Sequence, residues 1–469
     1  MVELVVDRIV AGGTGLAQLD GLKVFVPFAA PQERVRARIT VRKKDYAVAQ
    51  IAEILEPSPI RVPAPCPFYG ACGGCQLQHL SYEGQLIVKK LIVNDALQRI
   101  GRVFVPVRNI SGHSEPWRYR NKTQYPVQPQ EPNQALRQDS SASLTPSSTP
   151  EQEQTAARAD RAPSRPKVGF YRQDSHVLLD IPTCLLHPEA LDRIRAGAVE
   201  AIFAADETAY DERNHKGNIR HLVFRTSGTE TVVTVSTRTQ NIKPLLVERL
   251  AALAGVSGIV QTVNPDRTNR ILGNRTVLLA GRAELHFQVL DKSFRVSPLS
   301  FFQVNTGQAE ELCRKVLRYC APTGGETVLD LYSGVGMLTI ILAGFVGKVV
   351  GCEIEGSAIA DARFNAELAG ADNVEFIAGD VDNVIASIDR ADIVVLDPPR
   401  KGASPATIKH ITRLRPDRVV YVSCNPATLA RDLKLFEELG YQTTDVEPTD
   451  MFPQTFHVEV VTRLERKRG

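Results

Sequence analysis

The sequence lacks a strong charge bias, a long hydrophobic run and a secretory leader. Its 469 residues include 56 basic and 53 acidic side chains, which leaves a formal net charge of only +3. The uncharged and largely apolar run Leu331–Gly347 has 17 residues, fewer than the roughly 20 apolar residues of a membrane-spanning helix. Residues 1–13 contain Asp7 and no basic segment before an apolar core, unlike a secretory signal. We therefore expect a cytoplasmic protein with no membrane partner, and we expect a monomer.

The chain is not rich in cysteine. There are eight cysteines, and in a long cytoplasmic chain they are more often thiols, metal ligands or catalytic groups than a disulfide framework. With 43% hydrophobic and 23% charged residues, the composition is that of a globular protein. The length predicts two to four domains.

Residues 1–56 predict a small all-β module, because short apolar runs alternate with turns that contain glycine and proline. Basic and apolar side chains alternate from residue 34, so a strand places the basic ones on one face. Six basic residues lie here without an acidic one between them: Arg34, Arg36, Arg38, Arg42, Lys43 and Lys44. They form either a solvated charged face or the face of an OB-like β-barrel that tracks nucleic-acid phosphates.

The middle of the chain, residues 57–296, predicts an α+β domain. It begins with a stretch rich in proline and cysteine, and mixed strand and helix patterns follow over residues 168–290. Residues 128–166 are rich in Gln, Ser and Pro and have almost no large apolar side chain. Such a segment cannot bury enough surface to offset its ordering entropy, so we predict a disordered insertion.

Residues 297–469 predict a doubly wound, Rossmann-like α/β sheet. Strands and helices alternate strictly, which is typical of parallel strands with helical crossovers. We expect helices at about 303–319, 336–345, 357–369 and 426–439. The last two predicted strands have no helix between them, so they form an antiparallel pair.

Ligands bind such sheets at the carboxyl ends of the strands. The first strand ends in DLYSGVG, residues 330–336, and the second ends in Glu353, an acid that can hydrogen-bond ribose. Dinucleotide-binding folds share both features. However, Thr339 stands where their third glycine is expected, and the fourth strand ends in DPPR, residues 397–400. The combination resembles the S-adenosylmethionine-dependent methyltransferases.

Cys424 ends the fifth strand, and Asn425-Pro426 then begins a helix. A cysteine in such a place is most simply core filler. At the cofactor edge, however, a thiolate can add to C6 of a pyrimidine and make C5 nucleophilic enough to accept a methyl group. A general base must then remove the C5 proton; Glu459 is the candidate, and His457 can orient it. We also expect the helix start to give Cys424 thiolate character.

Several motifs, in order, resemble those of the bacterial RNA uracil-C5 methyltransferases of the iron–sulfur subgroup. They are SFFQVN (residues 300–305), DLYSGVG, DPPRKG, VSCNPATLARDL and FPQTFHVE. The resemblance covers nearly the whole chain and implies methyl transfer to C5 of a uridine, with Cys424 as nucleophile and Glu459 as base. It also implies contacts to S-adenosylmethionine by Gln303, Tyr332, Glu353, Asp397 and, on the adenine side, Asp380.

The same resemblance implies RNA as the partner. It identifies residues 1–56 as similar to a TRAM domain, which favours the phosphate-tracking role of the basic strand, and it makes WRYRNK (residues 117–122) an RNA-facing stretch. It implies 23S ribosomal RNA rather than transfer RNA. A cytosine-C5 methyltransferase is disfavoured, because those enzymes carry a Pro-Cys pair after the fourth strand and this turn reads Asp-Pro-Pro. A non-catalytic RNA-binding protein is disfavoured by the presence of both Cys424 and Glu459.

Cys66, Cys72 and Cys75 form a C-x5-C-x2-C loop. Such a cluster needs a fourth ligand, for which Cys184 is the candidate, and spacing alone leaves zinc and iron–sulfur open. The family resemblance implies a [4Fe–4S] cluster on these four cysteines, with a structural or RNA-positioning role. The other cysteines occupy apolar positions and are interpreted as core residues: Cys313, Cys320 and Cys352.

Overall fold

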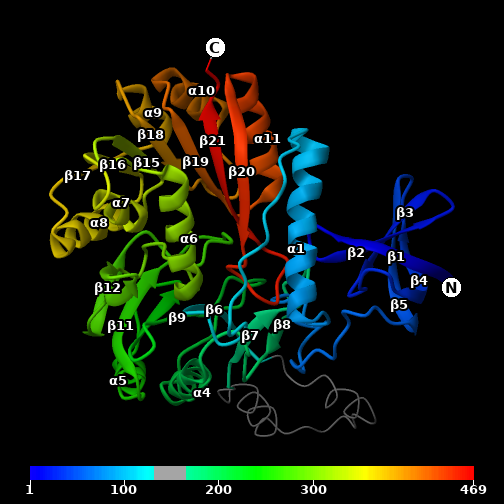
Figure 1. Cartoon of the computed structure of the whole chain (residues 1–469). Helices are drawn as coiled ribbons and strands as arrows, with labels where there is room; N and C mark the ends of the chain where they lie inside the picture. The colour runs from blue at the N-terminus through cyan, green and yellow to red at the C-terminus, as the bar shows by residue number, and fades with distance from the viewer. Residues whose placement is uncertain (131–164, 469) are drawn as a thin grey trace, which may run out of the picture. The chain divides into compact units, whose positions relative to one another are not determined.

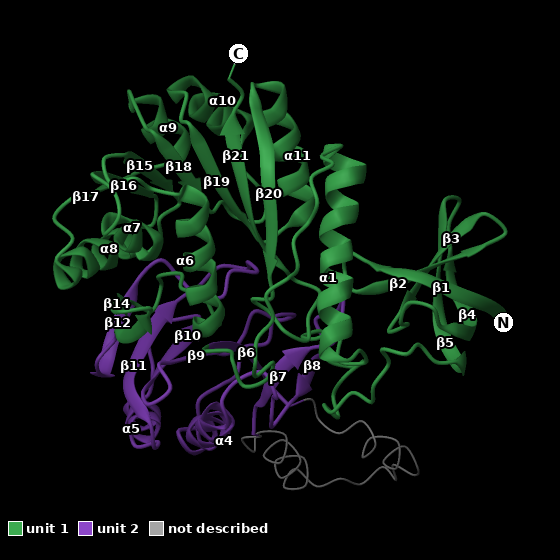
Figure 2. Ribbon diagram, viewed as in Figure 1, with its two compact units in different colours: residues 1–121, 284–469 green, residues 122–283 purple. Residues whose placement is uncertain are grey.

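The computed structural model describes residues 1–130 and 165–468 and divides into two compact units. Unit 1 contains Met1–Asn121 and Glu284–Gly469, and unit 2 contains Lys122–Ala283 (Figure 2). Residues 57–121, which the sequence analysis joins to the central domain, belong to unit 1. The three-domain division stays a prediction. The predicted insertion at residues 128–166 lies almost entirely outside the described residues.

Unit 1 begins with a closed five-stranded barrel, in which neighbouring strands follow the order β1-β2-β3-β5-β4 (Figure 1). The strands are β1 (Val2–Val10), β2 (Thr14–Leu19), β3 (Leu22–Pro27), β4 (Arg34–Arg42) and β5 (Tyr46–Glu56). Val35 and Ala37 of β4 share a core with Val24 and Val26 of β3. The arginines that alternate with them point away from this core. The predicted OB-like barrel is confirmed.

Helix α1 (Tyr82–Ala96) follows the barrel and continues into a π-helical turn over Leu97–Gly101. The Ser81 hydroxyl accepts a hydrogen bond of 3.2 Å from a backbone N–H of the first turn, as serine commonly does at a helix start. Asp95 of α1 forms an ion pair of 3.0 Å with Arg8 of β1. This contact joins the helix to the barrel.

Unit 2 is built on a seven-stranded sheet in the order β12-β11-β10-β9-β6-β7-β8. Its strands are β6 (Lys122–Gln128), β7 (Lys167–Tyr171), β8 (Leu178–Asp180), β9 (Ile219–Thr226), β10 (Thr231–Thr237), β11 (Val256–Val263) and β12 (Thr276–Gly281). Helices α4 (Glu189–Ala204) and α5 (Pro244–Ala251) share one hydrophobic core with the strands. This is the mixed α+β architecture expected for the central part of the chain.

Unit 1 ends in another seven-stranded sheet, in the order β17-β16-β15-β18-β19-β21-β20, preceded by a β13–β14 hairpin. The strands are β13 (Leu285–Val289), β14 (Lys292–Val296), β15 (Thr327–Leu331), β16 (Lys348–Glu353), β17 (Val374–Ala378), β18 (Ile393–Leu396), β19 (Arg418–Ser423), β20 (Tyr441–Thr449) and β21 (Glu459–Arg466). Strands β15 to β19 pair in parallel, and β20 and β21 are antiparallel, as predicted.

The helices that accompany this sheet are α6 (Thr306–Cys320), α7 (Met337–Ala343), α8 (Gly356–Ala369), α9 (Val381–Ala386), α10 (Pro405–Leu414) and α11 (Pro426–Glu438). Helices α6, α7, α8 and α11 begin close to their predicted positions, whereas α9 and α10 are missing from the prediction. Helix α9 is too short to show a helical period. No helix in the described parts of the chain is long and apolar enough to cross a membrane.

Candidate active site

Cys424 directly follows strand β19, and Glu459 begins the neighbouring antiparallel strand β21. In the pairing of β19 with β21, Ser423 is the partner of Val460. Continuing this register by one residue places Cys424, which follows β19, opposite Glu459, the first residue of β21. The charge of Glu459 also helps to raise the pKa of Cys424, after the larger effect of burial. The fold therefore brings together the two residues that the sequence assigns to catalysis.

The Cys424 thiol is less acidic than an ordinary thiol. Burial raises its pKa to about 11, the carboxylates of Glu459 and Asp397 add to the shift, and Arg400 opposes it. The prediction that the start of α11 gives Cys424 thiolate character is therefore wrong for the protein without ligands. A helix dipole contributes a modest effect that fades within one turn, and here desolvation and two carboxylates outweigh it.

Glu459 is a buried acid with an unused oxygen. Its side chain is 4% exposed, and its Oε2 atom has no hydrogen-bond partner among the described residues. Burial, followed by the charge of Asp397, raises the pKa of Glu459 well above its ordinary value, although Arg400 lowers it. Leaving a buried polar atom unpaired costs stability, and strongly shifted acids cluster at functional sites. Glu459 is thus placed to exchange a proton with a ligand.

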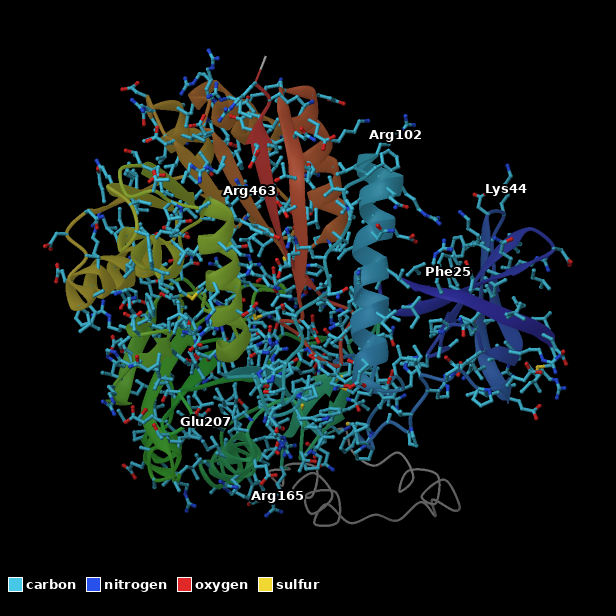
Figure 3. All side chains as sticks on the ribbon, in the orientation of Figure 1. Phe25, Lys44, Arg102, Arg165, Glu207 and Arg463 are labelled. Atoms are coloured by element: carbon cyan, nitrogen blue, oxygen red, sulfur yellow. The ribbon has the colours of Figure 1, made fainter. Side chains whose placement is uncertain are left out.

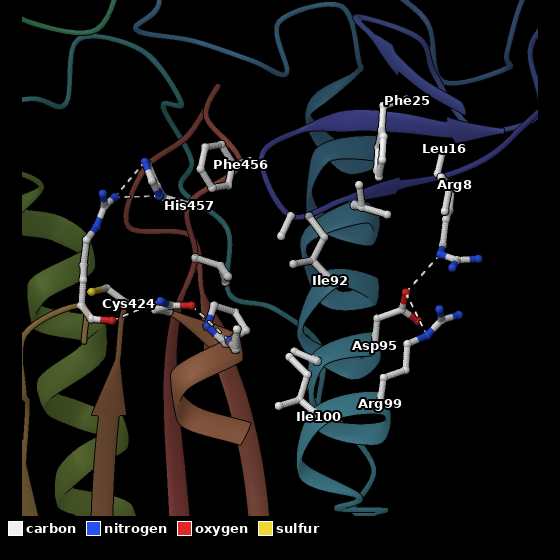
Figure 4. Close-up of a pocket in the computed structure, with 18 of the residues that line it drawn as sticks. Arg8, Leu16, Phe25, Ile92, Asp95, Arg99, Ile100, Cys424, Phe456 and His457 are labelled. Carbon is white, nitrogen blue, oxygen red and sulfur yellow. Dashed lines mark hydrogen bonds and ion pairs between the residues drawn. The ribbon is translucent and has the colours of Figure 1, made fainter. Parts of the chain in front are cut away.

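Arg400 is a cation of this site to which the sequence analysis gave no role. Its guanidinium lies 3.0 Å from both ring nitrogens of His457 (Figure 4). Burial and the charge of Arg400 lower the pKa of His457 to about 4, so the neutral ring accepts a hydrogen bond from Arg400. The Arg400 carbonyl in turn accepts a bond of 3.1 Å from the Asn425 side chain. The available sequence signal was a basic residue directly after Asp-Pro-Pro.

Tyr332 and Glu353 frame the glycine-rich turn after β15. Tyr332 has a φ of 65°, a left-handed conformation that is uncommon for a bulky side chain and frequent at ligand sites. The Glu353 carboxylate accepts hydrogen bonds from the backbone N–H groups of Gly334 at 3.0 Å and of Ile354 and Glu355 at 2.8 Å. These bonds hold the carboxylate beside the turn, where the sequence places the ribose.

Two aspartates lie at this edge: Asp330 is buried, and Asp397 is partly exposed. Burial raises the pKa of both to about 7, and the charge of Asp330 contributes to the shift of Asp397. The Thr339 hydroxyl donates a hydrogen bond of 2.5 Å to Asp330. Thr339, which replaces the third glycine of the dinucleotide motif, therefore anchors Asp330 under the glycine-rich turn.

The remaining predicted cofactor residues, Gln303 and Asp380, are both held by backbone contacts. Gln303 is buried, and its carbonyl accepts a hydrogen bond of 2.9 Å from the Asn121 side chain. Asp380 caps α9 by accepting a bond of 3.0 Å from the Asp382 N–H. Burial raises the pKa of Tyr332, and the charges of Asp382 and Asp380 contribute. Asp380 and Tyr332 are therefore neighbours at the cofactor edge.

The basic strand of the barrel is partly neutralised by acidic neighbours. Arg34 pairs with Glu56 at 3.1 Å, and Arg36 pairs with Glu53 at 2.5 Å and with Glu3 at 3.4 Å, while Arg38 donates to the Gln50 side chain. The last three basic residues are exposed: Arg42, Lys43 and Lys44. Lys44 lies at the tip of the barrel (Figure 3). Positive charge is thus most open at the β4–β5 hairpin.

The predicted RNA-facing stretch, residues 117–122, is anchored in unit 1 through its middle. The Tyr119 hydroxyl donates to the Pro453 carbonyl at 3.0 Å, and Arg120 pairs with Asn305 through the backbone. These contacts bring the stretch next to the loops that carry the site residues. Its RNA-facing role stays a prediction.

The cysteine loop does not itself form a metal site. Among residues 1–130 and 165–468, no group of three or more His, Cys, Asp or Glu side chains is arranged to hold a metal ion. Cys66, Cys72 and Cys75 share a loop of unit 1, and Cys184 belongs to unit 2. Burial raises the pKa of Cys72, whereas a metal-bound thiol must lose its proton. The [4Fe–4S] cluster therefore stays a prediction from the family resemblance.

The other three cysteines are core residues, as predicted. Cys313, Cys320 and Cys352 are all buried, and burial raises the pKa of Cys313 and Cys352 to about 12. Buried thiols of this kind are chemically inert.

Known proteins resemble this chain over its whole length. Residues 2–60 match the TRAM domain of tRNA (uracil(54)-C(5))-methyltransferase, and residues 322–451 match a methyltransferase domain. An uncharacterized RNA methyltransferase of Halalkalibacterium halodurans is 41% identical over 100% of this chain and 97% of its own, and one of Listeria innocua is 38% identical over 99% and 98%.

A solved structure agrees with these matches. The Pyrococcus abyssi tRNA (uracil-54, C5)-methyltransferase, in complex with S-adenosyl-L-homocysteine, superposes with a TM-score of 0.73 at 28% identity, over 99% of this chain and 100% of that one. The barrel, the doubly wound sheet and the cofactor edge described above are thus those of an S-adenosylmethionine-dependent enzyme that acts on RNA. The chain belongs to the TRAM-containing RNA methyltransferases, in agreement with the uracil-C5 methyltransferase resemblance of its motifs.

Proposed function

We propose that the protein methylates C5 of a uridine in RNA through a covalent adduct, with Cys424 as nucleophile and Glu459 as base. The observation that carries the proposal is the antiparallel pairing of β19 with β21, which ends at Ser423 and Val460 and so brings Cys424 and Glu459 to the carboxyl edge of the sheet. A thiol and a carboxyl group so placed meet the two demands of the reaction, addition at C6 and proton removal at C5. S-adenosylmethionine supplies the methyl group as an electrophilic carbon.

The reaction follows from these two side chains. The Cys424 sulfur forms a bond to C6 of uracil, and the electrons of the C5–C6 double bond move into an enolate. C5 then forms a bond to the methyl carbon, and the carbon–sulfur bond of the donor breaks. Glu459 removes the C5 proton, the double bond returns and the Cys424 sulfur leaves. The target uridine must leave its base stack to reach Cys424.

The Cys424 thiol must lose its proton before its sulfur adds to C6, and Glu459 must be a carboxylate when it takes the C5 proton. Burial raises the pKa of Cys424 to about 11 and that of Glu459 well above its ordinary value, and both shifts oppose these ionisations. Arg400 lowers the pKa of both groups. The positive charge of the bound methyl donor acts in the same direction, which ties formation of the nucleophile to occupancy of the cofactor site.

We propose ribosomal RNA as the substrate class, on the resemblance to the iron–sulfur subgroup, and transfer RNA as the second candidate. Transfer RNA is supported by the match of residues 2–60 and by the name of the Pyrococcus enzyme. Mapping 5-methyluridine by mass spectrometry, in strains with and without the gene, separates the two. Loss of the mark from 23S ribosomal RNA supports the first candidate, and loss from transfer RNA supports the second. An unchanged pattern in both contradicts the proposed function.

Trapping with RNA that contains 5-fluorouridine tests the mechanism. Fluorine at C5 cannot leave as a proton, so the covalent adduct persists and is seen as a slower band on a denaturing gel. We expect the adduct with the unmodified protein and none with Cys424→Ala. On ordinary RNA, Glu459→Gln accumulates adduct with little turnover. RNA with 5-fluorocytidine is the matched control, and an adduct on it instead would identify a cytosine-C5 enzyme.

We infer a [4Fe–4S] cluster on Cys66, Cys72, Cys75 and Cys184 from the resemblance, and no step above uses it. Support within the chain is limited to the three cysteines on one loop and a hydrogen bond of 3.4 Å from the Gly74 N–H to the Cys72 sulfur. Anaerobic purification tests it through the iron content, about four atoms per chain for such a cluster. A protein with zinc instead, or with no metal, would contradict the inference.

A further inference from the structure

A cavity of about 510 Å³ extends from Cys424 to the barrel (Figure 4). Its walls come from several parts of unit 1: strands β1 to β3, helix α1 with its π-helical turn, the loop that carries Arg400, the start of α11 and the loop before β21. The side chains assigned to the cofactor do not line it. The cavity therefore adjoins the nucleophile but is distinct from the predicted cofactor site, and its volume is typical of sites that hold a small organic group.

The walls of the cavity are positively charged. The cationic side chains in them are Arg8, Lys23, Arg99 and Arg400. The carboxylate among the lining residues is that of Asp95, which already pairs with Arg8 at 3.0 Å and lies 3.7 Å from Arg99. The first residues of α11 also line the cavity, and the amino end of a helix favours a nearby anion. The cavity thus suits a negatively charged group.

Two aromatic rings line the same space, Phe25 from the barrel and Phe456 from the loop before β21 (Figure 4). Alternation along β3 explains the first: Val24 and Val26 are buried in the barrel core, and Lys23 and Phe25 face outwards. Proteins that hold single-stranded nucleic acid combine such features, because rings stack on bases and cations pair with phosphates.

Direct contacts hold the barrel against the active-site loop. Gly13, between β1 and β2, lies so close that a Cβ atom there would be 2.7 Å from the Cβ of Gln76 and 3.3 Å from the Cβ of Phe456. Its φ of 76° also favours glycine. This contact and the pair between Arg8 and Asp95 fix the width of the cavity.

We propose that this cavity holds the nucleotide next to the target uridine in the RNA, with its base against Phe25 and Phe456 and its phosphate near Lys23. The inference rests on the proposed function, because it takes Cys424 as the point at which the target uridine is held. In this arrangement the barrel forms one wall of the active site and also binds RNA outside it.

Binding of two small probes, uridine 5′-monophosphate and the dinucleotide UpU, tests the proposal by calorimetry on the full chain. UpU supplies a neighbouring nucleotide whichever of its uridines enters the active site. We expect UpU to bind about tenfold more tightly than the mononucleotide, in line with the stacking of one base. Phe25→Ala and Lys23→Ala reduce this advantage to less than about threefold. Phe345→Ala, a substitution of a half-exposed phenylalanine outside the cavity, keeps it.

Equal binding of the two probes to the unmodified protein would overturn the proposal, as would an undiminished advantage in both Phe25→Ala and Lys23→Ala. Lys23 is exposed, so its variant reports on the cavity even if Phe25→Ala disturbs the barrel. The proposed function is tested separately by the 5-fluorouridine adduct. A protein that prefers UpU and forms no adduct would keep the cavity proposal and contradict the mechanism.

Discussion

The Lys89 ammonium group lies 2.5 Å from the Asp450 carboxylate, and both side chains are completely buried. Lys89 also donates to the Phe452 carbonyl at 3.0 Å, and the Tyr82 hydroxyl donates to Asp450 at 2.9 Å. Gln85 of the same helix exchanges hydrogen bonds with Gln454. Helix α1 therefore anchors the loop between β20 and β21, which delivers His457 and Glu459 to the active site.

Replacing Lys89 tests this anchor. Lys89→Met leaves the Asp450 carboxylate buried without its cation, a change that costs about 3–5 kcal/mol in proteins. We expect the free energy of unfolding, measured in urea, to fall by that amount. Lys90→Met is the matched control, because Lys90 bonds Asn109 at the surface and its loss costs about 0.5 kcal/mol or less. A similar small loss for both variants would show that the buried pair does not stabilise the fold.

Cofactor affinity is expected to depend on pH through Asp397. Burial and the charge of Asp330 raise its pKa to about 7, so Asp397 holds a proton below that pH and is a carboxylate above it. The sulfonium cation of S-adenosylmethionine binds more favourably to the ionised Asp397. Because Asp397 becomes protonated at lower pH, the Kd of S-adenosylmethionine rises by up to about tenfold for each pH unit below 7. S-adenosylhomocysteine has a neutral sulfur and shows a flatter profile.

Calorimetry with both molecules between about pH 6 and about pH 8 measures this difference. Asp397→Asn serves as control, because an amide does not titrate and the pH dependence of S-adenosylmethionine binding should flatten. Asp397 and Arg400 both shift the pKa of Glu459, so Glu459 and Arg400 remain unchanged in the comparison. Identical profiles for the two molecules would rule out a cationic contact at Asp397.

Arg400 is expected to set the reactivity of Cys424. Its charge lowers the pKa of the thiol against the opposing effects of burial, Glu459 and Asp397. Removing that charge in Arg400→Gln raises the pKa further, so the thiolate fraction falls at every pH below it. Alkylation of Cys424 by iodoacetamide, followed at the peptide level by mass spectrometry, should slow several-fold. Arg400→Lys keeps the charge and restores most of the alkylation rate. Equal slowing in both variants would mean that the shape of the arginine side chain, and not its charge, sets the reactivity of Cys424.

Much of this site could be predicted from the sequence, because its residues stand at strand ends. The alternation of strands and helices fixes the parallel sheet, and the missing last helix fixes the antiparallel pair that brings Glu459 to Cys424. The partners of Lys89 could not be predicted, since Asp450 lies 361 residues away in the sequence. The pKa of Cys424 could not be predicted either, because it depends on how far the folded surroundings exclude water.

The net charge of the basic strand β4 could not be predicted from the sequence either. Alternation correctly predicts that Arg34 and Arg36 share a face, but Glu53 and Glu56 reach them from β5, and strand register is not visible in the sequence. Two of the six basic residues therefore already have carboxylate partners, which compete with phosphates for the same guanidinium groups.

We accordingly expect RNA affinity to depend more on Lys43 and Lys44, at the exposed end of the β4–β5 hairpin, than on Arg34 and Arg36, which already have carboxylate partners. Replacing Lys43 and Lys44 by alanine should weaken RNA binding and reduce the slope of log Kd against log salt by about 0.7 to 0.9 for each phosphate that no longer has a lysine partner. The control pair, Arg34→Ala with Arg36→Ala, also removes two charges but leaves Glu53 and Glu56 unpaired. Its effect combines weaker attraction with new repulsion, so affinity falls while the slope changes less, because paired arginines release few counterions from the RNA. An equal change of slope in both pairs would mean that RNA displaces the glutamates and that the whole basic strand tracks phosphates.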